Sequence, residues 1–170
     1  CDGSTGEGDG IDSNGWLVIN GGTITAQACS SSGDAGIDSD KGIYINGGKV
    51  IASGNMLDHI AGGNQTYAVF NFVSRQKGSE TYTLKNSAGK VIGEYAPANA
   101  FTYLIVAGSE ITPDDYTFWQ GKTQLSGSKN QNQVGEISPT TLFFENSTRT
   151  HYSFVAAMMN LGIKVIDVNV

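Results

Sequence analysis

Two loops of this 170-residue chain carry carboxylates at matching positions. Asp9 and Asp12 lie in the first loop, and Asp38 occupies in the second loop the position that Asp12 has in the first. Ca²⁺ takes six to eight oxygen ligands, and acidic Gly-rich turns can supply them. One interpretation is a metal site with Ca²⁺ as the cofactor, formed by Asp9, Asp12, Asp34, Asp38 and Asp40. The other is turn formation alone, because Asp favours turns without any metal.

Aromatic residues follow both acidic loops. Trp16 and Tyr44 are expected to project from neighbouring strands, and exposed rings on a rigid sheet form a platform for sugar rings. Lys41 is the sole candidate for the base that a polysaccharide lyase needs. We therefore predict Trp16, Tyr44 and Lys41 as carbohydrate-binding residues. The alternative is that a downstream sheet covers the two rings as ordinary core.

A third group of candidate residues lies near the C-terminal end, where Ser147, Thr148, Arg149 and Thr150 open a run with helical spacing of apolar residues. Amide groups at a helix start, hydroxyls and a guanidinium together suit an anion. The alternative is a capped helix without a ligand. Other catalytic patterns are sparse: His59 and His151 are the only histidines, and no nucleophile motif such as G-x-S-x-G occurs. The chain is therefore not expected to be an enzyme.

The acidic loops and aromatic residues belong to an internal repeat. Residues 9–26 read DGIDSNGWLVINGGTITA, and residues 35–52 read AGIDSDKGIYINGGKVIA. Apolar and polar residues alternate on each side of an Asn-Gly-Gly turn, which is typical of two short strands per unit. Repeats of this length stack on each other to bury a shared face. Each unit is predicted to be one coil of a parallel β-helix over residues 1–64, with Asn20 and Asn46 forming an amide ladder.

The period changes after the repeat. Alternating runs at 66–73, 80–85, 91–95, 101–106 and 116–119, separated by turn signals, predict an antiparallel sheet over residues 65–125. Residues 126–136 are polar and predict a linker. Residues 137–170 predict a βαβ fragment. The expected fold class is all-β: a right-handed parallel β-helix of few coils, finished by an antiparallel sheet, with a short βαβ-like appendage.

Composition restricts the partners. The formal net charge of −6 argues against nucleic acid, whose binding depends on Lys and Arg. No apolar run approaches the roughly 18 residues of a membrane span. Cys1 and Cys29 precede their GID motifs by similar distances and are expected to be neighbours, as a disulfide or as two thiols. The oligomeric state is left open.

Two resemblances are specific enough to name. The motifs GDGIDS, INGGTITA and GIDSDKGIYINGGKVIA, with the segment YTLKNSAGKVIGEYAPANAFTYLIVAGSEITPDDYTFWQG, resemble a family of bacterial extracellular carbohydrate-binding proteins over residues 1–128. That resemblance implies a pectate-lyase-like β-helix, bound Ca²⁺, polysaccharide ligands that include acidic ones, and an extracellular or cell-surface location. The chain departs from the family in showing only two clear coils.

The second resemblance covers residues 143–170, FFENSTRTHYSFVAAMMNLGIKVIDVNV. It is similar to the carbamoyl-phosphate-binding segment of aspartate carbamoyltransferases, and implies that Ser147, Thr148, Arg149 and Thr150 hold the phosphate and carbonyl of that ligand. The main functional prediction is calcium-assisted, non-catalytic binding of polysaccharide, including uronate polymers. The alternatives are a truncated or fused carbamoyltransferase fragment without a complete active site, and a polysaccharide lyase.

Overall fold

The computed structural model describes residues 6–125. The chain divides into two units, Cys1–Ile137 and Ser138–Val170, and all the described residues belong to the first of them. Among the described residues, no helix is long and apolar enough to cross a membrane.

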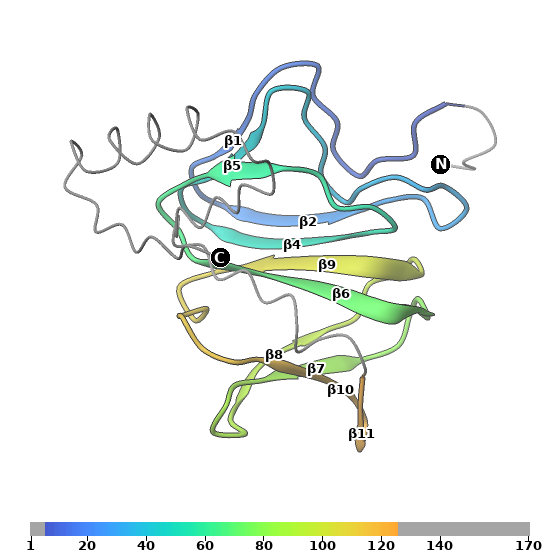
Figure 1. Ribbon diagram of the computed structural model, residues 1–170, viewed down its shortest axis with the longest axis vertical. Coiled ribbons are helices and arrows are strands. Elements are labelled where there is room, and N and C mark those ends of the chain that lie inside the picture. The colour runs from blue at the N-terminus through green and yellow to red at the C-terminus, as the bar shows by residue number, and fades with distance from the viewer. Residues whose placement is uncertain (1–5, 126–170) are drawn as a thin grey trace, which may run out of the picture. The chain divides into compact units, whose positions relative to one another are not determined.

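The described residues form β-strands joined by turns (Figure 1). The strands are β1 (Leu17–Ile19), β2 (Thr23–Gln27), β3 (Ile43–Ile45), β4 (Lys49–Gly54), β5 (Ile60–Gly62), β6 (Tyr67–Gln76), β7 (Tyr82–Lys85), β8 (Val91–Tyr95), β9 (Phe101–Ala107), β10 (Thr117–Gln120) and β11 (Thr123–Gln124).

A small parallel sheet has the order β1-β3-β5. β1 pairs with β3 in the register that the repeat requires, Leu17 opposite Ile43 and Ile19 opposite Ile45. At the turn after these strands, Asn46 Nδ2 donates to Asn20 Oδ1 at 2.9 Å. The predicted amide ladder and the predicted register of the two units are therefore confirmed.

The central sheet has the order β2-β4-β9-β6. β2 and β4 are parallel and pair in the register of the repeat, with Ile24 opposite Val50, whereas β9 pairs antiparallel with both β4 and β6. β6 and β9 contain nearly continuous apolar runs, such as Phe101–Ala107, which suits strands covered on both faces. Figure 1 shows this sheet between the other two.

The third sheet is antiparallel, with the order β11-β10-β7-β8. β7 and β8 form a hairpin whose turn is closed by Asn86, which accepts the Lys90 N–H at 2.9 Å, and by Gly89, which has φ +76°. Such positive φ values suit glycine.

Two apolar cores separate the three sheets. On β9, Ile105 packs into the core shared with the parallel sheet, and Leu104 packs into the core shared with β7, β8 and β10. This alternation follows from the two-residue period of a strand. Phe118 of β10 lies in the second core, against Phe70 and Tyr95.

The predicted fold class is wrong. A parallel β-helix adds a parallel strand to every sheet with each coil, but the described residues form three separate sheets, and the strand next to β4 is the antiparallel β9. The strands of the predicted single antiparallel sheet are divided between two sheets. β6 and β9 pair within the central sheet, whereas β7, β8 and β10 form the third sheet. The individual strands predicted between residues 66 and 119 are confirmed as β6 to β10. The predicted linker 126–136 and βαβ fragment 137–170 lie outside the described residues.

Candidate functional site

The two acidic loops are joined by a reciprocal pair of hydrogen bonds. Asp34 Oδ2 accepts the N–H of Gly8 at 2.6 Å, and Asp9 Oδ1 accepts the N–H of Ala35 at 2.8 Å. Each bond links a residue of the first loop to its counterpart in the second loop. Asp9 and Asp34 therefore hold the loops together through backbone amides, which is the turn chemistry named as the alternative to a metal.

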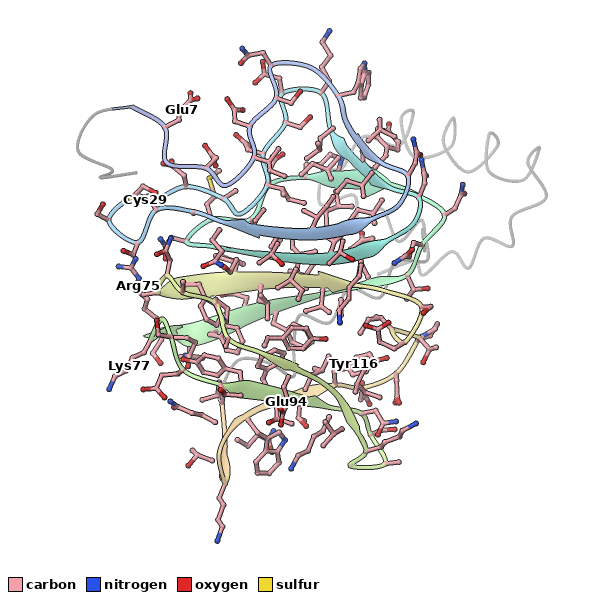
Figure 2. All side chains as sticks on the ribbon, turned by 180° about the vertical axis from the view of Figure 1, so that it is seen from behind. Glu7, Cys29, Arg75, Lys77, Glu94 and Tyr116 are labelled. Carbon is pink, nitrogen blue, oxygen red and sulfur yellow. The ribbon has the colours of Figure 1, made fainter. Side chains whose placement is uncertain are left out.

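Several carboxylates lie close together around these two loops. Figure 2 shows Glu7 in this region, near Cys29. The charge of Asp12, and next a side-chain hydrogen bond between the two carboxyl groups, raise the pKa of Glu7 above its ordinary value. Burial raises the pKa of Asp9, which the hydrogen bond from Ala35 partly opposes. Carboxylates this close to one another resist simultaneous ionisation.

Asp38 has a second carboxylate beside it, that of Asp58. Asp58 Oδ2 accepts the N–H of Ser39 at 3.0 Å. Burial, and next a side-chain hydrogen bond with Asp58, raises the pKa of Asp38 to about 6. Asp58 is not among the predicted site residues, because it follows β4 outside the repeated pattern; a carboxylate in the loop directly after the second unit was the available signal.

Within residues 6–125, no group of three His, Cys, Asp or Glu side chains is arranged to hold a metal ion. Asp12 and Asp40 are exposed, and Asp9 and Asp34 already accept backbone hydrogen bonds. Calcium binding by these loops stays a prediction. The predicted pairing of the two cysteines also stays a prediction, since Cys1 lies outside the described residues; Cys29 is buried, with its Sγ 3.3 Å from Ser31 Oγ.

The two predicted aromatic side chains lie next to each other, but their rings are not coplanar. The rings of Trp16 and Tyr44 are 5.7 Å apart between centroids and tilted by 57°. Trp16 is 57% exposed. Val18 of β1, which pairs with Tyr44 of β3, is 49% exposed. No other sheet of the described residues covers Trp16 as core. Lys41 is exposed, and its backbone N–H donates to Gly15 O at 3.0 Å.

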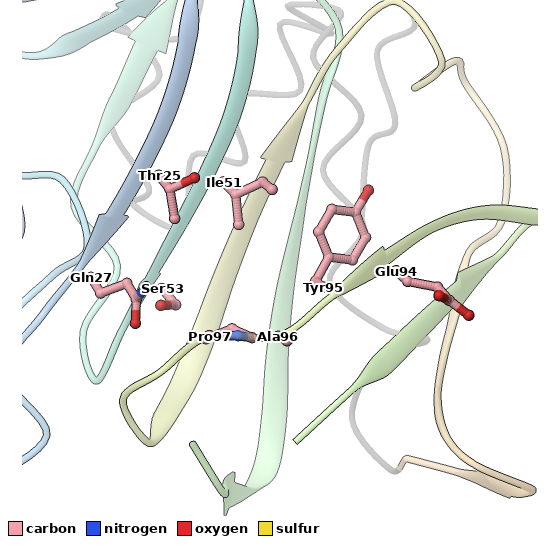
Figure 3. A pocket seen from close by; sticks show the side chains of 8 residues that line it. All are labelled: Thr25, Gln27, Ile51, Ser53, Glu94, Tyr95, Ala96 and Pro97. Carbon is pink, nitrogen blue, oxygen red and sulfur yellow. The ribbon is translucent and has the colours of Figure 1, made fainter. Parts of the chain in front are cut away.

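A pocket of about 210 Å³ opens on the face of β2 and β4 that is turned away from the core shared with the parallel sheet. The end of β8 and the residues that follow it form the opposite wall (Figure 3). The side-chain oxygen of Gln27, in the wall of the pocket, already has a hydrogen-bond partner, because Oε1 accepts the N–H of Asn99 at 3.0 Å. Figure 3 shows the Tyr95 hydroxyl directed away from the other lining residues, and burial raises the pKa of Tyr95 to about 12. The pocket contains none of the predicted site residues; its lining is Thr25, Gln27, Ile51, Ser53, Glu94, Tyr95, Ala96 and Pro97.

The predicted anion-binding residues Ser147, Thr148, Arg149 and Thr150 lie outside the described residues. They fall within the part of the chain that resembles a known family. Residues 117–170 match the model of the carbamoyl-phosphate-binding domain of aspartate and ornithine carbamoyltransferases. The match therefore begins at β10, inside the β-structured unit, and continues to the last residue of the chain.

One curated relative gives the same indication. The aspartate carbamoyltransferase catalytic subunit of Malacoplasma penetrans (strain HF-2) is 45% identical over 51 residues, which is 29% of this chain and 17% of that protein. The chain thus spans less than a fifth of the length of this relative. No solved structure matches the chain.

These comparisons correct the main functional prediction. Calcium-assisted polysaccharide binding, its polysaccharide partner and the associated carbohydrate-binding and pectate-lyase-like classification are wrong, because both matches are to carbamoyltransferases. Neither comparison supports the expected extracellular location. The carbamoyltransferase resemblance of the C-terminal part is confirmed.

Proposed function

We propose that the C-terminal part of this chain binds carbamoyl phosphate. The observation that carries the proposal is the match of residues 117–170 to a carbamoyl-phosphate-binding domain, a range that includes Ser147, Thr148, Arg149 and Thr150. In this proposal those four residues hold the phosphate and the carbonyl oxygen of the ligand.

The chemistry of the four residues supports this assignment. Three hydroxyls supply neutral donors, and the guanidinium of Arg149 supplies parallel donors that match phosphate oxygens in pairs. The chain has a net charge of −6, which repels an anion at long range. Binding therefore depends on the local cation, and Arg149 is the residue whose loss should matter most.

We also propose that residues 117–170 by themselves bind the ligand without transferring its carbamoyl group to aspartate. The chain matches 17% of the length of the carbamoyltransferase relative, so most of that protein has no counterpart in the match. Binding of one substrate requires fewer groups than orientation of two substrates for reaction.

Calorimetric titration of the full chain with fresh carbamoyl phosphate tests the binding. Arg149→Ala should weaken binding by roughly tenfold or more, the size expected for a charge-assisted hydrogen bond. Arg75→Ala is the matched control, because Arg75 is an exposed arginine on β6 whose guanidinium donates to Ser30 O. Arg75→Ala should leave the affinity unchanged.

Equal loss in both variants would show a general charge effect and contradict the site. Titration with inorganic phosphate separates the anion from the carbamoyl group, since the proposal requires tighter binding of carbamoyl phosphate. Formation of carbamoyl-aspartate by the purified chain would overturn the non-catalytic part of the proposal alone.

A further inference from the structure

The outer edges of β1 and β2 lie on the same side of the described unit. β1 ends the order of the parallel sheet, and β2 ends the order of the central sheet. Within residues 6–125, no strand pairs with either outer edge. Such edges present a row of backbone groups that can accept another strand.

The bonds between the two units show what this edge offers. The N–H groups of Asp38, Asp40 and Asn46 donate to the carbonyls of Ile11, Ser13 and Ile19. Since β1 and β3 are parallel and in the register of the repeat, the corresponding N–H groups of the first unit point outward. These groups belong to Asp12, Asn14 and Asn20. Asn20 accepts from Asn46 through Oδ1, so its own Nδ2 is the donor with which the ladder could continue.

The apolar face of the repeat continues to this edge. Ile37, Ile43 and Val50 of the second unit are fully buried. Their counterparts in the first unit, Ile11, Leu17 and Ile24, pack on the same core but remain partly exposed. The first unit covers these apolar residues of the second unit, but its own equivalent residues are left without such a cover.

A glycine at the turn is the independent observation. A Cβ on Gly47 would lie 2.9 Å from Asn20 O, so the stacked first unit requires glycine there. At Gly21, the counterpart of Gly47, no atom of the described residues lies within 4 Å of such a Cβ, and φ is not in the left-handed region. Nothing in the described unit requires glycine at residue 21. A further turn stacked on the first unit would require it, just as the first unit requires glycine at residue 47.

We propose that this edge binds one further strand–turn–strand segment with the pattern of the repeat itself, in parallel register with β1 and β2. The partner is a polypeptide with a GIDS loop, two alternating strands and an Asn-Gly-Gly turn. Its backbone bonds continue both sheets, its Asn side chain extends the ladder from Asn20, and its apolar side chains cover Leu17 and Ile24.

This partner fits the edge better than a second copy of the chain does. A twofold axis would place β2 antiparallel to its copy, which loses the parallel register and the stacking of the turns. A head-to-tail contact would need an open parallel edge at the opposite side of the central sheet, but β9 covers β4 there and β6 follows it.

The test uses the full chain and a labelled synthetic peptide, AGIDSDKGIYINGGKVIA, the sequence of residues 35–52. Fluorescence anisotropy should show saturable binding of this peptide and none of a scrambled peptide. Gly21→Val should weaken binding by roughly tenfold or more, because the side chain meets the added turn. Gly33→Val is the matched control: Gly33 also has open space around it and no positive φ, and it lies outside the strands.

Hydrogen exchange provides the second readout, with slower exchange expected at the amides of Asp12, Asn14 and Asn20 when the peptide is bound. Equal binding of the scrambled peptide, or equal affinity of Gly21→Val and Gly33→Val, would overturn the proposal. Sedimentation of the chain alone separates the other occupant: a dimer at micromolar concentration that excludes the peptide would assign the edge to a second copy.

Discussion

The carboxylates of the acidic loops bind backbone amides of the neighbouring unit. Asp9 and Asp34 each accept an N–H from the partner loop, and Asp58 accepts one from Ser39. Such local bonds fix the loops against each other, but they bring like charges close together. Asp38 is where this conflict is largest, because it is both partly buried and adjacent to Asp58.

Stability should therefore fall as the pH rises through the titration of Asp38. Its pKa is raised from an ordinary 3.8 to about 6, so the folded chain binds more protons than the unfolded chain between these values. The stabilisation is full below the unfolded pKa and is lost as the pH passes the folded pKa. Urea unfolding at steps from about pH 4 to pH 7 measures this loss. Asp38→Asn should flatten the curve.

Other groups contribute to the same curve, so the variants must be compared with each other. The raised pKa values of Glu7 and Asp9 act in the same direction as that of Asp38, and the lowered pKa of Asp114, caused by Ser87, acts in the opposite one. Asp40→Asn is the matched control, because Asp40 is an exposed carboxylate in the same loop. A curve equally flat in both variants would exclude Asp38 as the responsible group.

At the scale of elements, β10 belongs both to the family match and to the β-structured unit. It is the first segment of the residues that match the carbamoyl-phosphate-binding domain, and it is also a strand of the third sheet. The side chain of Phe118 is fully buried, with its ring centroid 4.8 Å from that of Phe70 and 5.9 Å from that of Tyr95. In this chain the first residues of the match are thus part of the core of the β-structured unit.

Phe118→Ala should lower the free energy of unfolding of the β-structured unit by about 3–5 kcal/mol, because it removes a fully buried ring. Trp119→Ala is the control on the same strand. Trp119 is only partly buried, and Lys85 Nζ lies 4.4 Å from its ring centroid, a contact that contributes about 1 kcal/mol. Chemical denaturation followed by near-UV circular dichroism measures both. Similar losses in the two variants would contradict this placement of β10.

At the scale of the molecule, the central sheet shares its two faces between two cores. The first core depends on the repeat, and the second depends on β10 to close the sheet that covers it. The described unit needs residues as far as β11, although the resemblance to carbamoyltransferases begins several residues earlier.

A chain of residues 1–125 should therefore fold cooperatively, whereas a chain of residues 1–116 should not. The shorter chain lacks β10 and Phe118, and the loss is comparable to the about 5–15 kcal/mol of a typical domain. Urea denaturation and amide exchange of both truncated chains check this. A cooperative transition in residues 1–116 would show that β10 is dispensable.

The sequence by itself determined the local and repeated features. The offset of the repeat predicted the register of Leu17 with Ile43 and the contact between Asn20 and Asn46, since identical units stack with identical side chains aligned. Alternation located the later strands, because a period of two follows from strand geometry alone. The motif around Arg149 likewise indicated the resemblance that the comparisons support.

Only the tertiary structure decided which strands became neighbours. Alternation shows which residues share a face, but it does not show which edge the strand will pair with, because sheet pairing joins segments distant in sequence. For that reason the insertion of β9 between β4 and β6 and the division into three sheets were not predictable. The sequence places Asp58 directly after the second unit, but only the fold brings its carboxylate to Asp38. The same pairing left the outer edge of β1 and β2 open among the described residues.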